Sequence, residues 1–380
     1  MGVLIFVATG AARAIYAVFK GVFPARHKVV FLSRQSETPS RDFEAIAQAL
    51  RDADPTLEIV VRCRMVGHTW ASRAGAAVST IGQMYHLATA RACVVDGYVI
   101  PVSVLDHRRG LFVMQIWHAL GAIKKFGYQT IGAPGGHSAK IASAMRMHHN
   151  YDVVVCGGPA AVPAFAEAFG TDASRVEPLG LPRMDALRSA CAAGPAAPGT
   201  AALLDRFPRL REPGHRVVLY APTLRTGGAN RYSDVAASFA DDRYTLVIKP
   251  HPLESVSIAG GNIVNAQGAA VEEILPLCSD LITDYSAIAF EAAAIGVPTY
   301  FYVYDIDDYR RDTGLNLDPL IDMPDVSSRD IGTLSGILSA GVEHRAVTDM
   351  LRDGYASAPY GCAARIAHRI IDAVKADTTA

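Results

Sequence analysis

The chain has 380 residues, of which half are hydrophobic and 19% are charged, and its formal net charge is −1. This length exceeds one ordinary hydrophobic core and predicts two domains. The balanced charge lacks the basic footprint of a nucleic-acid-binding protein, so no nucleic-acid partner is expected. The six cysteines lie far apart and form no C-x-x-C pair, which predicts reduced thiols instead of a disulfide or zinc framework.

Residues 1–27 predict an amphipathic helix that lies in a membrane interface. Wound as a helix, Arg13, Tyr16 and Lys20 share one face. The opposite face is apolar and carries Leu4, Ala8, Ala11, Ile15, Val18 and Val22. Apolar burial and the attraction of basic residues to anionic lipid suit such a helix to a membrane surface. The alternative is a first helix that packs on its own domain.

Residues 28–189 predict a first α/β domain. Apolar runs at 28–33, 57–63, 93–96, 111–117 and 151–156 alternate with helical segments. Strands that are apolar throughout and separated by helices indicate a parallel sheet covered on both faces.

Residues 190–215 are expected to form a linker or variable loop, because their first part is rich in Ala, Gly and Pro. A second α/β domain is predicted over residues 216–360, with strands at 216–221, 244–249, 262–264, 281–283 and 299–304. Residues 361–380 predict a last helix that crosses back to the first domain. The predicted fold class is therefore α/β, with two Rossmann-like doubly wound domains facing a cleft.

Polar side chains follow the predicted strands of both domains, where ligands of such sheets bind. His118 follows the strand at 111–117, and a neutral histidine there can take a proton from an attacking hydroxyl. The strands of the second domain end on Pro222, Thr223 and Arg225, on Lys249 and His251, and on Asp284 and Ser286. Lys249 and Arg225 can neutralise a diphosphate, and Ser286 lies where helix N-terminal amides suit phosphate oxygens. A turn that merely caps its helix is the alternative for Asp284 and Ser286.

Five segments in order resemble the CDP-glycerol glycerophosphotransferase family of teichoic acid synthesis, with its TagB-type primases and TagF-type polymerases. The family pattern runs W-H-G-T-x-x-K-x-x-G, G-x-P-R-x-D, Y-A-P-T-W-R, R-x-H-P and T-D-Y-S-S-x-x-F-D. The corresponding segments are WHALGAIKKFG from Trp117, GLPRMD from Gly180, YAPTLR from Tyr220, KPHP from Lys249 and TDYSAIAFE from Thr283. Any one segment is a weak signal, whereas five in family order are a strong one.

The resemblance implies a fold of glycosyltransferase-B type, attached peripherally to the cytoplasmic face of the cell membrane. It implies transfer of glycerol phosphate from CDP-glycerol to a hydroxyl of a lipid-linked saccharide acceptor, with CMP leaving. His118 is the implied general base and His251 the implied contact to the donor phosphates. The family's other substrate positions fall on Arg183, Pro222, Thr223, Lys249, Ser286 and Glu291. The expected substrate-binding set is completed by Ala119, Gly121, Arg225 and Asp284.

The chain departs from the family pattern at several of these positions. Ala119-Leu120 replaces Gly-Thr beside the base, Lys249 replaces an arginine with its planar fork, and Ala287 replaces the second serine. Glu291 replaces Asp and reaches further by one methylene. These changes leave CDP-ribitol or another CDP-polyol open as the donor.

Two other classes are also left open, a nucleotide-sugar glycosyltransferase of the same fold and a non-catalytic membrane-bound scaffold. No cofactor and no metal are expected, and Asp305, Asp307 and Asp308 are interpreted as a solvated turn. A homo-oligomer is also left open.

Overall fold

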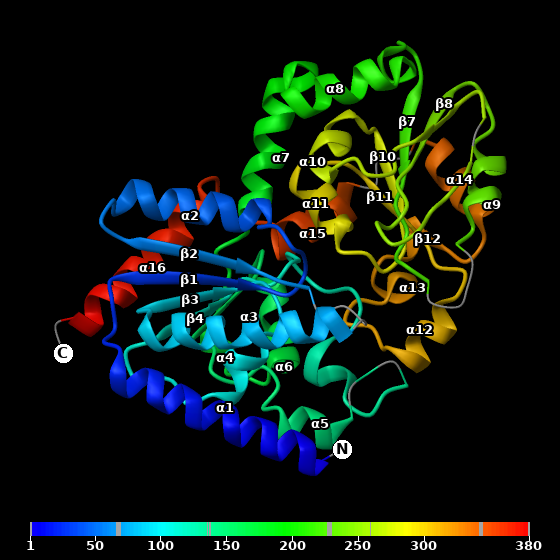
Figure 1. Ribbon diagram of the computed structural model, residues 1–380. Coiled ribbons are helices and arrows are strands. Elements are labelled where there is room, and N and C mark those ends of the chain that lie inside the picture. Colours follow the sequence, from blue (N-terminus) through cyan, green and yellow to red (C-terminus); the bar gives the residue numbers. More distant parts are fainter. Residues whose placement is uncertain are drawn as a thin grey trace.

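A computed structural model describes residues 2–65, 70–134, 136, 138–225, 230–258, 260–341 and 345–378. Within these residues the chain forms two parallel sheets of six strands each, covered by helices on both faces (Figure 1). The predicted α/β fold with two doubly wound halves is therefore confirmed.

The first sheet has the strand order β2-β1-β3-β4-β5-β6. Its strands are β1 (Lys28–Ser33), β2 (Glu58–Cys63), β3 (Ala92–Val95), β4 (Phe112–Gln115), β5 (Val153–Val155) and β6 (Val176–Glu177). Its helices are α1 (Gly2–Val22), α2 (Arg41–Ala53), α3 (Trp70–Thr89), α4 (Ile100–Val104), α5 (Ala139–Ala144) and α6 (Val162–Phe169). Side chains alternate across β1, so Val29 and Phe31 pack with α2 while Val30 and Leu32 pack with α1, α3 and α4.

The second sheet has the order β12-β11-β10-β7-β8-β9. Its strands are β7 (Arg216–Tyr220), β8 (Tyr244–Ile248), β9 (Ile263–Asn265), β10 (Asp280–Thr283), β11 (Thr299–Tyr302) and β12 (Ser327–Ser328). Its helices are α9 (Tyr232–Ser238), α10 (Val271–Ile274), α11 (Ile288–Ala294), α12 (Ile306–Asp312), α13 (Pro319–Asp322), α14 (Ile331–Ser339) and α15 (Arg345–Tyr355).

Two helical segments join the halves. α7 (Pro182–Ala193) and α8 (Pro198–Arg206) lead from the first sheet to the second. The expectation of a loop at 190–215 is wrong, because this segment contains the end of α7, all of α8 and two short 3₁₀ turns. The last helix, α16 (Cys362–Thr378), crosses back and lies along α2 of the first domain (Figure 1).

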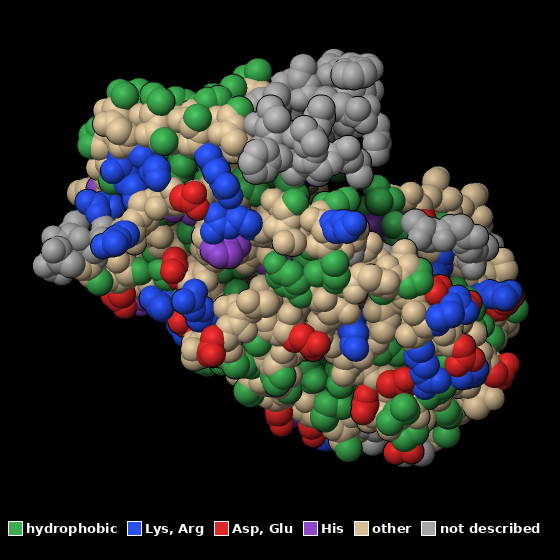
Figure 2. Space-filling view, turned by 90° about the horizontal axis from the view of Figure 1, so that it is seen from below, with side chains coloured by type: hydrophobic (Ala, Val, Ile, Leu, Met, Phe, Trp, Pro, Cys, Tyr) green, Lys and Arg blue, Asp and Glu red, His purple; other side chains and the backbone are tan. Residues whose placement is uncertain are grey.

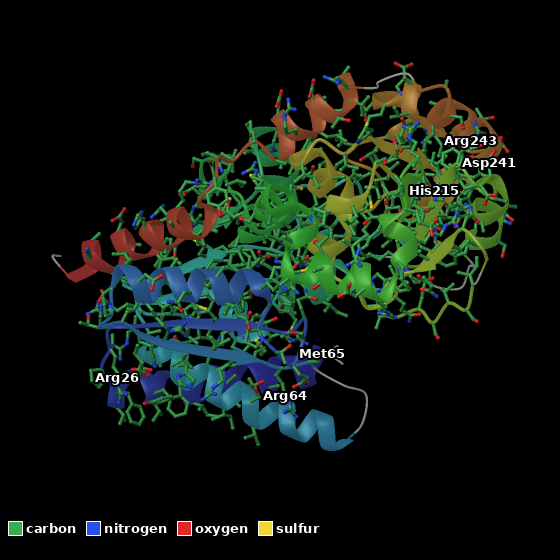
Figure 3. All side chains as sticks on the ribbon, turned by 90° about the horizontal axis from the view of Figure 1, so that it is seen from above. Arg26, Arg64, Met65, His215, Asp241 and Arg243 are labelled. Carbon is green, nitrogen blue, oxygen red and sulfur yellow. The ribbon has the colours of Figure 1, made fainter. Side chains whose placement is uncertain are left out.

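The carboxyl ends of both sheets turn toward the middle of the molecule. Arg26 precedes β1 and lies at the outer end of the first domain, whereas Arg64 and Met65 follow β2 and lie at its inner end (Figure 3). His215 and Arg243 directly precede β7 and β8, and they lie at the outer end of the second domain. Side chains that follow the strands of either sheet therefore face the junction of the two domains.

Helix α1 packs on its own domain through its polar face. Arg13 Nε donates to the carbonyl of Val104 at 3.1 Å, and the Tyr16 hydroxyl lies 2.8 Å from Nδ1 of His107. The apolar face turns outward, and Ile15, Val18 and Val22 are exposed. The helix is thus docked on the domain with its apolar stripe exposed, and its position at a membrane stays a prediction. Within the described residues, no helix has the length and apolar character needed to cross a bilayer.

Candidate active site

The backbone before His118 is held in an uncommon conformation. Trp117, the residue before it, has a positive φ of 54°, which costs a non-glycine residue free energy. Gln115 at the end of β4 offsets this, because its side-chain oxygen accepts from the Trp117 amide at 2.8 Å and its Nε2 donates to the Gly97 carbonyl. The Trp117 ring also stacks on Phe126. His118 follows this turn directly and is exposed at the carboxyl end of the sheet.

The hydrogen bonds of His118 define its tautomer. Nδ1 lies 3.1 Å from the carbonyl oxygen of Asp96, the residue that follows β3. A carbonyl oxygen only accepts, so Nδ1 carries the hydrogen and Nε2 of the neutral ring keeps its lone pair. Burial lowers the pKa of His118, and the charges of Arg183 and Lys124 lower it further. Near neutral pH, His118 is therefore an unprotonated base with its lone pair on Nε2.

His251 has the opposite arrangement. It follows β8 through Lys249 and Pro250, and its Nδ1 accepts from the Leu253 amide at 3.2 Å. With Nδ1 occupied as an acceptor, the hydrogen of the neutral ring lies on Nε2. Burial lowers the pKa of His251, and Lys124 and Lys249 lower it further. His251 is thus a neutral hydrogen-bond donor, suited to a phosphate oxygen and unsuited to the role of base.

Lys124 is the cation that links the two histidines, and the sequence analysis did not select it. Its charge lowers the pKa of both His118 and His251, so its ammonium group lies within electrostatic reach of both rings. Its side chain is solvent-exposed, and partial desolvation lowers its own pKa, opposed by Asp284. The signal was present in the sequence, because Lys124 stands at the lysine of the segment that begins with Trp117.

A bridge between the two domains holds the Lys124 segment in place. Lys124 pairs with Leu315 in an isolated antiparallel bridge, and the Lys125 amide donates to the Gly314 carbonyl at 3.0 Å. The Asn316 amide donates in turn to the Ile123 carbonyl at 2.7 Å. Backbone contacts from the second domain therefore position the loop that carries His118 and Lys124.

Asp284 ties together the strand ends of the second domain. Its carboxylate accepts from the Thr223 amide at 3.0 Å and from the Thr223 hydroxyl at 2.7 Å. Arg225 lies 2.8 Å from Asp284 and 2.7 Å from Asp305, and its side chain is only 7% exposed. Arg225 is thus neutralised by two carboxylates. The interpretation of Asp305 as part of a solvated turn is wrong, because Arg225 and the Tyr285 hydroxyl bind it.

Arg183 connects the first domain, the second domain and the base. Its guanidinium binds Asp42 of α2 at 2.8 Å and Glu291 of α11 at 3.3 Å. One of its N–H groups also donates to the His118 carbonyl at 2.9 Å. Arg183 and Glu291 line a hollow of about 230 Å³ between the domains, together with Ser40, Arg41, Asp42 and Glu272. These contacts make Arg183 a positioning residue for His118.

The remaining predicted residues lie at or beside this junction. Lys249 is half-buried, and desolvation lowers its pKa while Glu291, Glu272 and Glu273 raise it. Ser286 is partly exposed just before α11, and its hydroxyl lies 3.5 Å from the Ile288 amide. Pro222 and Ala119 are buried. A Cβ at Gly121 would lie 2.7 Å from the Tyr355 ring and 3.0 Å from the Phe290 ring, so its small size serves close packing between the domains.

The two sheets and the junction between them define a two-domain protein of glycosyltransferase-B type. Among solved structures, that of the wall teichoic acid polymerase TagF has a TM-score of 0.72 at 17% identity, covering 99% of this chain and 96% of that one. A UDP-GlcNAc 2-epimerase from Neisseria meningitidis has a TM-score of 0.56 at 12% identity, covering 90% and 99%. At these identities the likeness shows the fold alone.

The chain belongs to the CDP-glycerol:poly(glycerophosphate) glycerophosphotransferase family, whose model matches residues 14–357. The resemblance drawn from the five segments is therefore confirmed.

Two relatives from Bacillus illustrate the range of the family. The teichoic acid ribitol-phosphate primase of Bacillus spizizenii is 30% identical over 80% of both chains. The teichoic acid glycerol-phosphate primase of Bacillus subtilis is 25% identical over 63% of this chain and 62% of its own. The chain is thus an enzyme of the teichoic acid CDP-polyol phosphotransferase family.

Proposed function

We propose that this enzyme transfers a polyol phosphate from a CDP-linked polyol to a hydroxyl of a lipid-linked saccharide, with release of CMP. One observation carries the proposal: two histidines of opposite tautomer, His118 and His251, follow strands of different domains whose carboxyl ends face the same junction. His118 offers a lone pair on Nε2, His251 offers a hydrogen on Nε2, and Lys124 supplies a positive charge. Phosphoryl transfer to a hydroxyl needs a base that takes the hydroxyl proton, and it needs a hydrogen-bond donor and a cation that stabilise the phosphate charge.

In the proposed step, the acceptor hydroxyl attacks the phosphorus that carries the polyol. An oxygen–phosphorus bond forms to the acceptor, and the bond from that phosphorus to the bridging oxygen of the diphosphate breaks. The hydroxyl proton moves to Nε2 of His118, and CMP leaves with the bridging oxygen. Hydrogen bonds from His251 and Lys124 stabilise the charge that develops on the diphosphate oxygens. Lys249 and Ser286, which follow neighbouring strands, are the further groups that we assign to the donor phosphates.

Glycerol phosphate from CDP-glycerol is the transfer implied by the five segments, and ribitol phosphate from CDP-ribitol is the second candidate. The ribitol-phosphate primase relative favours the second, as it is 30% identical over 80% of this chain. Glu291 was expected to contact the polyol, but Arg183 already binds its carboxylate. We therefore assign Glu291 to the support of Arg183.

We further propose that the enzyme acts at the cytoplasmic face of a membrane, on which the outward face of α1 rests. A row of hydrophobic side chains runs along this edge of the molecule, with lysine and arginine side chains beside it (Figure 2). Replacing Ile15, Val18 and Val22 by serine is expected to abolish sedimentation with anionic vesicles. The unfolding midpoint is expected to stay unchanged, because all three side chains are exposed. Unchanged sedimentation would contradict the membrane assignment.

The test of the reaction is a CMP-release assay with CDP-glycerol, CDP-ribitol and UDP-sugars as donors and a lipid-linked amino sugar as acceptor. We expect CMP from one CDP-polyol and no turnover of UDP-sugars. His118→Asn is expected to lower turnover by about 10²–10⁴-fold. The matched control is His368→Asn, since His368 is exposed on α16, away from the junction. Absence of CMP from every CDP-polyol would refute the proposal.

A further inference from the structure

An apolar groove opens beside α1, on the side of the first domain that carries the exposed stripe. It has a volume of about 240 Å³ and lies between α1, α3, α4 and the residue that follows α5. Its lining residues include Ala12, Met84, Ile100, Leu105 and Met145. Among the residues that the structure describes, none that lines the groove is charged. At about 30 Å³ for each water-sized group, the groove holds about eight such groups. This space suits a length of hydrocarbon chain.

The helices around the groove carry a concentration of exposed apolar side chains. Six of the eleven large hydrophobic residues that are exposed in the described chain lie on the three helices α1, α3 and α5. They are Ile15, Val18, Val22, Val78, Ile81 and Ile141. Exposed apolar side chains gathered on neighbouring helices are typical of a binding surface.

Positive charge flanks the groove at the segment that follows Leu105. Arg146 lies 2.7 Å and Arg13 4.0 Å from the exposed carboxylate of Asp106, and the Lys20 ammonium group donates to the Asp106 carbonyl. Three cations around one carboxylate leave a net charge of +2 at this point. An anionic group joined to an aliphatic chain complements such a pairing of charge and groove.

The groove also lies close to the base. Asp96, whose carbonyl holds Nδ1 of His118, precedes the groove residue Ile100 by four residues. With consecutive Cα atoms about 3.8 Å apart, their Cα atoms are at most about 15 Å from each other. The groove and His118 therefore lie within the length that one extended lipid-linked saccharide can span.

We propose that this groove binds the aliphatic chain of the lipid-linked acceptor, with the acceptor's phosphate beside Arg13 and Arg146. The proposal rests on the proposed function for the identity of the acceptor. It adds a subsite that binds the lipid part of that substrate. The affinity for the acceptor then depends on the length of its aliphatic chain. Each methylene that enters the groove strengthens binding by about fourfold.

The first test needs no turnover. The full chain is titrated calorimetrically with methyl phosphate and with dodecyl phosphate below its micelle concentration. We expect dodecyl phosphate to bind at least a hundredfold more tightly. Ala12→Leu and Ile100→Phe fill the groove from two walls and are expected to reduce this preference to below tenfold. Ala14→Leu adds the same side chain to the exposed face of α1 and is expected to keep the full preference.

The second test uses acceptors that carry the same saccharide on a methyl or a dodecyl tail. We expect the wild type and Ala14→Leu to show a lower acceptor KM for the dodecyl tail, and the two groove-filling variants to show equal KM values and an unchanged kcat for the methyl tail. A chain-length preference that is absent in the wild type, or unchanged in both groove-filling variants, would overturn the proposal. The proposal would also be overturned if the groove-filling variants lost vesicle binding and nothing else, because bulk lipid would then be the occupant of the groove. Failure of CMP release alone would refute the proposed reaction and leave the titration result standing.

Discussion

Removal of the Arg183 charge tests how the junction is held together. Arg183 binds Asp42 and Glu291, whose side chains are only 3% and 11% exposed, and is itself 26% exposed. Arg183→Met leaves both carboxylates desolvated and without the guanidinium that binds them. Breaking a buried pair in this way costs about 3–5 kcal/mol, so we expect the free energy of unfolding to fall by this amount at neutral pH. Urea unfolding followed by tryptophan fluorescence measures it.

The pH dependence of the variant follows from Glu291. Burial raises the pKa of Glu291 even with Arg183 present, and Arg183 opposes that rise. Without Arg183 the folded pKa lies further above the unfolded value, so folding favours the protonated carboxyl. The variant is therefore expected to recover stability as the pH falls from 7 toward 5. Its loss in free energy of unfolding relative to the wild type is expected to be largest above that range.

Two controls separate the charge effect from a general loss of packing. Arg188→Met, on the same helix, removes hydrogen bonds to two carbonyl groups and leaves no carboxylate unpaired, so a loss of about 1 kcal/mol is expected. Arg183→Met combined with Asp42→Leu removes both members of the main pair and is expected to recover at least half of the loss. A loss below about 1 kcal/mol for Arg183→Met would refute this reasoning. A lower kcat with an unchanged donor KM would show positioning of His118, whereas a raised donor KM would show contact with the donor.

Three further predictions concern the same region. The value of kcat/KM should rise with pH through the pKa of His118, which lies below its usual 6.5, and His118→Gln should remove this acid limb. Lys124→Met should move the limb to higher pH, because the lysine charge lowers the pKa of His118, and should raise the donor KM; Lys125→Met should do neither. Gly121→Ala should destabilise the protein by about 1–3 kcal/mol through overpacking. Gly82→Ala, in open space on α3, should stabilise it by about 0.5–1 kcal/mol. Thermal unfolding measures both changes.

The sequence was sufficient for ten of the twelve strands of the described chain and for the family, whereas the two-residue strands β6 and β12 were not predicted. The run at 28–33 forms β1 (Lys28–Ser33) as predicted, because a strand that is apolar throughout can only be buried on both faces. The segment at 190–215 was misread because its composition is rich in Gly and Pro. Pro198 stands at the start of α8, where its fixed φ and missing N–H favour a helix, and this positional signal outweighs the composition.

Local patterns did not reveal which charges pair with one another. Arg225 was expected to meet a diphosphate, and the structure surrounds it with Asp284 and Asp305, which lie 59 and 80 positions further along the chain. Lys124 was passed over because a lysine in a loop carries no sign of enclosure in its own sequence. Its backbone bridge to Leu315 of the second domain, which only the tertiary structure shows, makes it part of the junction.

Helix α1 separates the two kinds of information most clearly. The spacing of apolar and polar residues determined by itself that residues 2–22 form a helix with two unlike faces, since periodicity is a local property of the chain. Which face turns inward was decided by the tertiary structure. The carbonyl of Val104 and the ring of His107, each 91 residues beyond its partner on α1, offer hydrogen bonds to Arg13 and Tyr16. Satisfying these polar groups holds the polar face against the domain and leaves the apolar face exposed.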